Sequence, residues 1–250
     1  MATRSSARDI ATPTRSRQGP GTRRPGVREQ AAQATRESLL RAAIKVFSKH
    51  GLDGGSVEMI SRAAKSHDRM IYYYFGNKEG LYIAALEEIY RRFNEAEARL
   101  DLDPQRPIEG LRAVVSFMFT YYRRNPEFVT LLNNENLHRG KHIAKSQRAR
   151  EYSSPALGVV DTLLRAGTSA GVFRSGVSAR DLYLMIAAMC YFYQSNRFTL
   201  SSFLGENLET ADALAHWEAF VTDAVMRTVL ARTDSLAPGA PVASAPSPNR

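Results

Sequence analysis

The chain has 250 residues, of which 44% are hydrophobic and 24% are charged, as in an ordinary globular protein with a sizeable core. Its single cysteine excludes an internal disulfide framework. The 34 Lys and Arg residues outweigh 25 Asp and Glu residues, and the net charge of +9 favours a polyanionic partner, either nucleic acid or acidic lipid.

The first 27 residues carry more than half of this charge. They contain six arginines and one aspartate, a net of +5, among many Thr, Ser, Ala, Pro and Gly residues. Such a segment buries too little apolar surface to offset the entropy of ordering, so we expect residues 1–27 to be a disordered basic arm. An arm that grips nucleic acid and a merely solvated tail both fit this composition.

Residues 28–77 are also basic, with a net charge of +3, which leaves only +1 for residues 78–250. This asymmetry indicates two functions in one chain. Apolar residues recur with helical rather than strand periodicity. A first helix is expected to end at Gly51, which suits a left-handed cap. The apolar stripe of this helix consists of Leu40, Ala43, Ile44 and Phe47.

Two short helices are predicted next. Ser56 is a favourable N-cap for the first, Lys65 and Ser66 form a tight connection, and the second covers about residues 67–75. These are the dimensions of a helix-turn-helix motif. In such motifs the second helix enters the major groove of DNA while the first holds it in place.

The rest of the chain is predicted to be helical. Asn77 can cap a long helix that begins at Lys78. Its apolar stripe consists of Tyr82, Ala85, Leu86, Ile89 and Phe93. Further helices are expected over residues 107–124, 126–137, 154–170, 178–199 and 208–232. A Pro-rich tail, residues 233–250, is expected to be disordered.

No membrane partner is expected. The longest apolar run, residues 182–193, has twelve residues, whereas a membrane-spanning helix needs about 20. The run therefore indicates a helix buried in the core or in an interface.

Three stretches carry a recognisable motif. They are residues 35–51, then Ser56-Val-Glu-Met-Ile60 with Ala63-Ala64, and Ile71-Tyr-Tyr-Tyr-Phe-Gly-Asn-Lys-Glu-Gly-Leu-Tyr82. In order and spacing, over about residues 33–82, they resemble the TetR family of bacterial transcriptional regulators. The resemblance implies an all-α fold. A three-helix helix-turn-helix DNA-binding domain, residues 28–77, would precede a larger helical ligand-binding and dimerisation domain, residues 78–232.

The resemblance also implies a function. The chain would be a homodimeric repressor that binds a palindromic operator in double-stranded DNA and is released by an unknown small-molecule effector. Residues 178–199 and 208–232 would pair across the two-fold axis. Because half-sites lie about 34–36 Å apart, a small shift carried by the helix from Lys78 would release the DNA. The implied location is the bacterial cytoplasm, on the nucleoid when DNA is bound, with no cofactor.

The resemblance assigns candidate DNA contacts to nine residues: Ser56, His67, Asp68, Arg69, Met70, Tyr72, Tyr73, Tyr74 and Lys78. Arg69 can donate to guanine O6 and N7, the commonest specific base contact. Tyr72, Tyr74, Lys78 and Ser56 match positions that contact phosphates, which set register rather than sequence. Consecutive helical residues point about 100° apart, so the three tyrosines cannot all be in the core.

The motif departs from the family pattern at the turn. Lys65 stands where the family usually has glycine, and a left-handed conformation there costs on the order of 1 kcal/mol. Asp68 stands where a basic or neutral residue is usual. It either caps the third helix, which we favour, or reads a cytosine amino group.

Candidate ligand-binding residues are aromatic, thioether or polar side chains that can converge inside the helical domain: Phe117, Tyr121, Phe128, Asn134, Asn136, His138, Tyr152, Met185, Met189 and Tyr193. Plain core packing is the alternative for each aromatic or Met residue. His138 and His142 have a spacing that suits a metal on a helix, but Gly140 indicates a helix end. We interpret them as surface histidines without a metal, and Cys190 as a buried thiol.

Two other classes of function stay open. An enzyme is disfavoured, because the sequence shows no nucleotide-binding glycine loop, nucleophile elbow or convincing metal set, and no catalytic residue is predicted. A DNA-binding protein without ligand control would share the basic arm and the first three helices.

Overall fold

The computed structural model describes residues 26–146, 148 and 154–231. Within these residues the chain forms nine α-helices, one 3₁₀ helix and no strand beyond an isolated bridge between Phe173 and Leu230. The all-α prediction is therefore confirmed. The helices are α1 (Val27–Gly54), α2 (Val57–Ala63), α3 (Asp68–Phe75), α4 (Lys78–Glu97), α5 (Pro107–Arg124), α6 (Pro126–Leu137), η1 (Ile143–Lys145), α7 (Ser154–Ser169), α8 (Ala179–Leu204) and α9 (Ala211–Val229).

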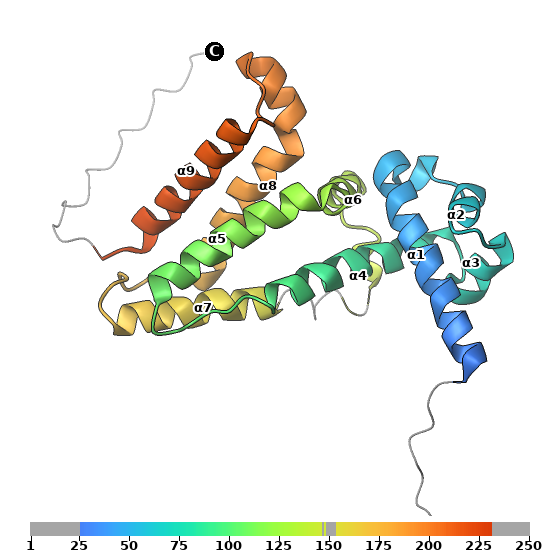
Figure 1. The fold of residues 1–250 in the computed structure, drawn as a ribbon, viewed down its shortest axis with the longest axis horizontal. Helices are drawn as coiled ribbons and strands as arrows, with labels where there is room; N and C mark the ends of the chain where they lie inside the picture. Colours follow the sequence, from blue (N-terminus) through green and yellow to red (C-terminus); the bar gives the residue numbers. More distant parts are fainter. Residues whose placement is uncertain (1–25, 147, 149–153, 232–250) are drawn as a thin grey trace, which may run out of the picture.

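The helices form two groups at opposite ends of the molecule (Figure 1). Helices α1, α2 and α3 cluster at one end, α5, α7, α8 and α9 build the other, and α4 runs between them. Within α1 the helical path is interrupted at Gly51, whose φ of 67° is the left-handed conformation expected from the sequence. The interruption turns the chain toward α2.

Helix starts lie where capping residues predict them. The side chains of Ser56, Asn77 and Ser178 accept hydrogen bonds from the backbone N–H groups of Met59, Gly80 and Asp181. Such caps satisfy donors that the first helical turn leaves unpaired. Helices α5 and α6 each begin with a proline and have the bounds predicted for them.

Helices α4 and α6 pack between the two groups. All five members of the predicted α4 stripe are buried: Tyr82, Ala85, Leu86, Ile89 and Phe93. Helix α6 contacts both α1 and α8. The Asn134 side chain donates to the backbone oxygen of Phe47 in α1, at 3.4 Å, while Asn133 accepts from the Tyr191 hydroxyl of α8, at 2.5 Å. Helix α6 thus joins the two ends of the molecule directly.

The last two helices differ from the prediction. Helix α8 continues to Leu204 and ends at Gly205, which has a φ of 69°. Helix α9 begins later than predicted, because Thr210 caps it. On α9 the side chain of Phe220 is 51% exposed in the single chain, although its position in the predicted helix has the spacing of a core residue. The prediction did not include η1.

Several predictions lie outside the described residues. These are the tail at residues 233–250, almost all of the arm at residues 1–27, and Tyr152. In the described part of the chain, no helix is long and apolar enough to cross a membrane.

Candidate functional site

Helix α3 presents one outward face. Arg69, Tyr72 and Tyr73 have the i, i+3, i+4 spacing that places side chains together on a helix, and all three are exposed. Tyr72 is 54% exposed and Tyr73 is 77% exposed, which is unusual for side chains of this size. Ile71 is fully buried on the opposite side and fixes the helix to the core. The outward face therefore combines a cation with two aromatic rings that solvent reaches.

Other candidate residues of this helix are placed differently. His67 occupies the N-cap position and is exposed, but its side chain makes no capping hydrogen bond. Met70 and Tyr74 are partly buried against the hydrophobic core. The Tyr74 ring also packs edge-on against Tyr73, with ring centroids 4.9 Å apart. Met70 and Tyr74 therefore support the outward face from behind.

Asp68 is the first residue of α3, and its carboxylate accepts a hydrogen bond from the buried Ser61 hydroxyl of α2. The favoured interpretation of Asp68 as the helix N-cap is wrong, because the cap position belongs to His67. Sequence reasoning also missed Ser61. A hydroxyl and a carboxylate seven residues apart, on either side of a short turn, are the signal that could have identified the pair.

The turn between α2 and α3 has the strained conformation predicted for it. Lys65 has a φ of 52°, in the left-handed region that favours glycine. Backbone hydrogen bonds close the turn, with Ser66 N–H donating to the oxygen of Ser61 at 2.9 Å. From α1, the Ser38 hydroxyl donates to the oxygen of Ala64 at 3.2 Å. Hydrogen bonds from α1 and from α2 therefore stabilise the turn.

Two further candidate residues lie at helix starts. The Ser56 oxygen accepts from Met59 N–H at 3.2 Å, and a hydrogen bond to Ser56 lowers the pKa of Glu58. Lys78 is the first residue of α4, and its ammonium donates to the backbone oxygen of Asp53 at 3.4 Å. Lys78 therefore lies against the last turn of α1.

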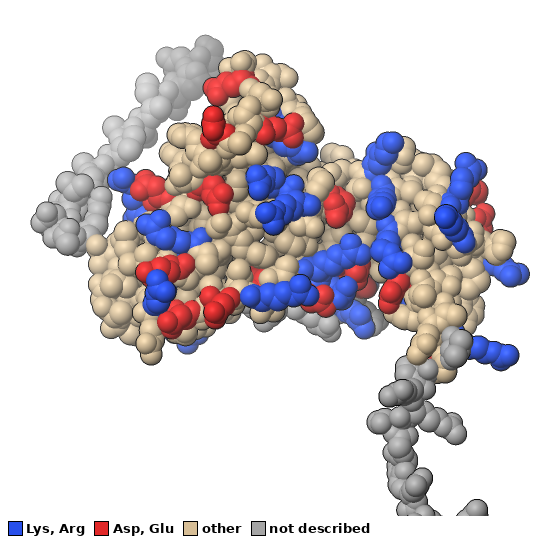
Figure 2. Space-filling model, viewed as in Figure 1, with Lys and Arg blue, Asp and Glu red and all other residues tan. Residues whose placement is uncertain are grey.

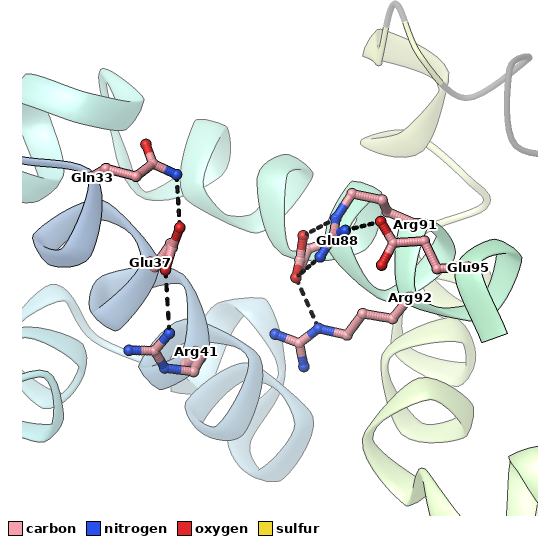
Figure 3. A network of polar contacts seen from close by, with 7 residues as sticks. All are labelled: Gln33, Glu37, Arg41, Glu88, Arg91, Arg92 and Glu95. Carbon is pink, nitrogen blue, oxygen red and sulfur yellow. Dashed lines mark hydrogen bonds and ion pairs between the residues drawn. The ribbon is translucent and has the colours of Figure 1, made fainter. Parts of the chain in front are cut away.

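Charge is unevenly distributed over the face drawn in Figure 2. Lys and Arg side chains stand along the end built by α1, α2 and α3 and at its junction with α4, whereas acidic and basic side chains mingle elsewhere. At the junction, Glu37 of α1 contacts Gln33 and Arg41, and Glu88 of α4 contacts Arg91 and Arg92 (Figure 3). Each contact drawn there stays within one helix, so these ion pairs do not lock α1 to α4.

A cavity of about 480 Å³ opens between α4, α5, α6, η1 and α8. Its described walls are mainly apolar, and six of the lining residues are aromatic: Tyr90, Phe93, Tyr122, Phe128, Tyr183 and Tyr191. Burial raises the pKa of Tyr183 and Tyr191 to about 12, so both hydroxyls stay protonated at neutral pH. An apolar cavity with a few polar groups suits a small organic ligand.

Two of the candidate ligand residues, Phe128 and Asn136, line this cavity. Phe117 and Tyr121 line a separate hollow beside α5. Asn134 contacts α1, and the His138 ring packs on that of His142. The other described candidates lie between α8 and neighbouring segments. The Met185 sulfur accepts from the Thr228 hydroxyl, and the backbone oxygen of Met189 accepts from the Trp217 indole N–H. The Tyr193 hydroxyl donates to the backbone oxygen of Leu208.

Sequence reasoning missed the tyrosines that dominate the cavity walls. Tyr183, Ala187 and Tyr191 recur at intervals of four on α8, and all three line the cavity. Phe128, Leu132 and Asn136 do the same on α6. Two such stripes facing one another are the signal that could have identified the cavity.

The interpretation of His142 as a surface histidine is wrong. It is 3% exposed rather than on the surface, and its Nδ1 lies 2.9 Å from the Glu135 carboxylate. The chain turns back after α6 because Arg139 and Gly140 both have positive φ. No group of three metal-ligating side chains lies together among the described residues. Cys190 is buried, as predicted, and burial raises its pKa to about 12.

Comparison with known proteins accounts for most of the chain. Residues 39–85 match a family model described as bacterial regulatory proteins of the tetR family, and residues 107–225 match the tetracyclin repressor-like C-terminal domain. A repressor from Pseudomonas putida, NicS, is 53% identical over 206 residues, which cover 82% of this chain and 97% of that protein. The chain belongs to the TetR family of transcriptional regulators.

Other relatives agree with this assignment. The Streptomyces coelicolor repressor SCO4008 is 27% identical, over 63% of this chain and 77% of that protein. Among solved structures, a TetR regulator from Chloroflexus aurantiacus has a TM-score of 0.59 at 23% identity and covers 81% of this chain and all of that one. A regulator of Streptomyces coelicolor, SCO4942, also has a TM-score of 0.59, at 19% identity over 78% of this chain and 98% of that one. These two structures support the fold.

The two family matches assign a type of domain to each end of the molecule. The tetR-family match covers the C-terminal half of α1, the helix-turn-helix and the start of α4. The C-terminal-domain match covers α5 to α9. The TetR-family chain is thus a DNA-binding transcriptional regulator rather than an enzyme.

Proposed function

We propose that this regulator is a homodimeric repressor that a small-molecule ligand releases from a palindromic operator in the bacterial cytoplasm. The observation that carries the DNA-binding half of the proposal is the outward face of α3, where Arg69, Tyr72 and Tyr73 are exposed together. The NicS relative is a transcriptional repressor, which supports repression as the outcome of DNA binding.

In the proposed complex, α3 enters the major groove and α2 holds it there. Arg69 reads guanine, because its guanidinium matches O6 and N7. Tyr72 and Tyr73 contact bases or backbone from the same face. Lys78 and Ser56 bind phosphate at the flanks, where the α4 N-terminus adds its dipole to the attraction.

Dimerisation is proposed through α8 and α9. These helices expose six large apolar side chains in one chain: Leu184, Phe192, Phe198, Phe203, Leu204 and Phe220. Exposed apolar patches of this kind mark protein interfaces. A symmetric pairing would cover them and set the separation of the two α3 helices on the operator.

The aromatic cavity is the proposed effector site. Its wall includes α6, which also contacts α1 through Asn134. A ligand that displaces α6 would therefore change how α1 to α3 are held. Ligand and operator must then weaken one another by the same factor. The sequence predicts that the effect of the ligand reaches the DNA-binding end through α4. Helix α6 offers a second route.

Two substitutions test the operator contacts. The probe is the duplex that the full chain selects from a randomised library, compared with random DNA of equal length. Arg69→Ala is expected to relax sequence preference by about 1–3 kcal/mol. Lys78→Ala is expected to weaken both duplexes alike and to reduce the slope of log affinity against log salt by about one. Equal losses on both duplexes for Arg69→Ala would contradict base reading.

A further inference from the structure

Helix α3 is connected to α2 by only four residues, 64–67. One of them, Lys65, has a left-handed backbone conformation. The angle between the two helices is therefore set by the backbone of this short turn together with the contacts that bridge the helices. A side-chain contact between the two helices comes from the hydroxyl of Ser61, a buried residue in the last turn of α2.

The Ser61 hydroxyl has one proton and three acceptors within reach. Its oxygen lies 3.0 Å from the backbone oxygen of Val57 and 3.3 Å from that of Glu58, and it also contacts the Asp68 carboxylate. A hydrogen bond to a carboxylate is stronger than one to a neutral carbonyl, so the Ser61 hydroxyl donates its hydrogen bond to the Asp68 carboxylate. This bond joins the last turn of α2 to the first residue of α3.

The partner residue lies immediately before the outward face. Asp68 precedes Arg69, and Ile71 in the same helix is fully buried and anchors it to the core. A change at Asp68 would therefore rotate Arg69, Tyr72 and Tyr73 about a fixed anchor. The bond also keeps the Asp68 carboxylate turned toward α2.

We propose that the hydrogen bond between Ser61 and Asp68 sets the orientation of α3, and that both residues are positioning residues for sequence recognition. The proposal rests on the proposed function and deepens it. Asp68 then acts as a hydrogen-bond acceptor for Ser61, and it reads no base.

A double-mutant cycle on the full chain tests this. The measured quantity is the ratio of affinities for the selected duplex and for random DNA, for wild type, Ser61→Ala, Asp68→Ala and the double variant. Each single variant is expected to lower the ratio about tenfold, and the double variant no further, because they remove the same bond. Asp68→Asn keeps an acceptor oxygen but loses the charge that attracts the Ser61 hydroxyl, so it is expected to lower the ratio less than Asp68→Ala does.

The controls separate positioning from other roles. Ser48→Ala, a matched change at a partly buried serine of α1 far from α3 in the chain, is expected to leave the ratio unchanged. The selection is repeated with Asp68→Asn to test whether Asp68 reads a base. A new preferred base at one position would show that it does, and would overturn the proposal. Additive losses, or an unchanged ratio for Ser61→Ala, would also overturn it. Failure of the wild-type chain to select any sequence would instead refute the proposed function, and this inference with it.

Discussion

At the scale of single residues, Glu97 is a buried carboxyl group with an unpaired oxygen among the described residues. Its side chain is 3% exposed at the end of α4, and its Oε2 has no hydrogen-bond partner among the described residues. Burial without a partner disfavours the charged form, and desolvation raises the pKa of Glu97 to about 7. The folded state therefore holds a proton that the unfolded chain loses near pH 4.5.

This makes stability depend on pH. Between about pH 4.5 and 7 the folded state binds more protons than the unfolded state, so the free energy of unfolding falls as pH rises and levels off above 7. Glu97→Gln is expected to remove this loss and to stabilise the protein by about 2–3 kcal/mol at pH 8. Urea unfolding from pH 5 to 8 at fixed protein concentration measures it, with exposed Asp101→Asn as control. Parallel curves for wild type and Glu97→Gln would contradict the expectation.

At the scale of elements, α6 and η1 form one unit through Glu135. This buried carboxylate accepts from the backbone N–H of His142 at 2.7 Å and of Ile143 at 2.9 Å, and it contacts the His142 ring. Ile143 in turn lines the aromatic cavity, and the His142 ring packs on Tyr82 of α4. Glu135 therefore holds the short helix between the cavity and α4.

Removing this carboxylate should loosen η1. Glu135→Ala is expected to lower the free energy of unfolding by on the order of 3 kcal/mol, because buried donors lose a charged acceptor. Glu135→Gln should cost less, because one acceptor oxygen is kept. Urea unfolding gives the energies, and hydrogen exchange should show faster exchange at residues 141–146. Glu127→Ala in the first turn of α6 is the control, and equal losses in the two alanine variants would refute this role.

At the scale of the whole molecule, the apolar face of α8 and α9 should govern assembly. Phe220→Asp is expected to dissociate the dimer, because it places a charge where the proposed interface would exclude water. Operator affinity should fall by about 100-fold or more, since two linked half-sites bind more tightly than one. Sedimentation measures the mass, and Leu137→Asp, at a side chain 82% exposed on α6, is the matched control. A dimer that persists in Phe220→Asp would refute this interface.

Much of the fold was predictable because its signals are local. Pro107 and Pro126 mark the starts of α5 and α6, and Ser56, Asn77 and Ser178 cap their helices as expected. The outward face of α3 was only partly predictable. Spacing places Arg69 with the exposed tyrosines, but it does not reveal that Tyr74 packs inward.

The amino-acid sequence alone determined the helical class, most helix starts, the basic N-terminal region and the family, because periodicity, caps and motifs act over a few neighbouring residues. Only the tertiary structure decided the partner of Asp68, the burial of His142, the exposure of Phe220 and which tyrosines enclose the cavity. These features depend on the path of the chain through turns at Lys65, Arg139 and Gly205, and on helices distant in sequence. Spacing within one helix does not encode such contacts.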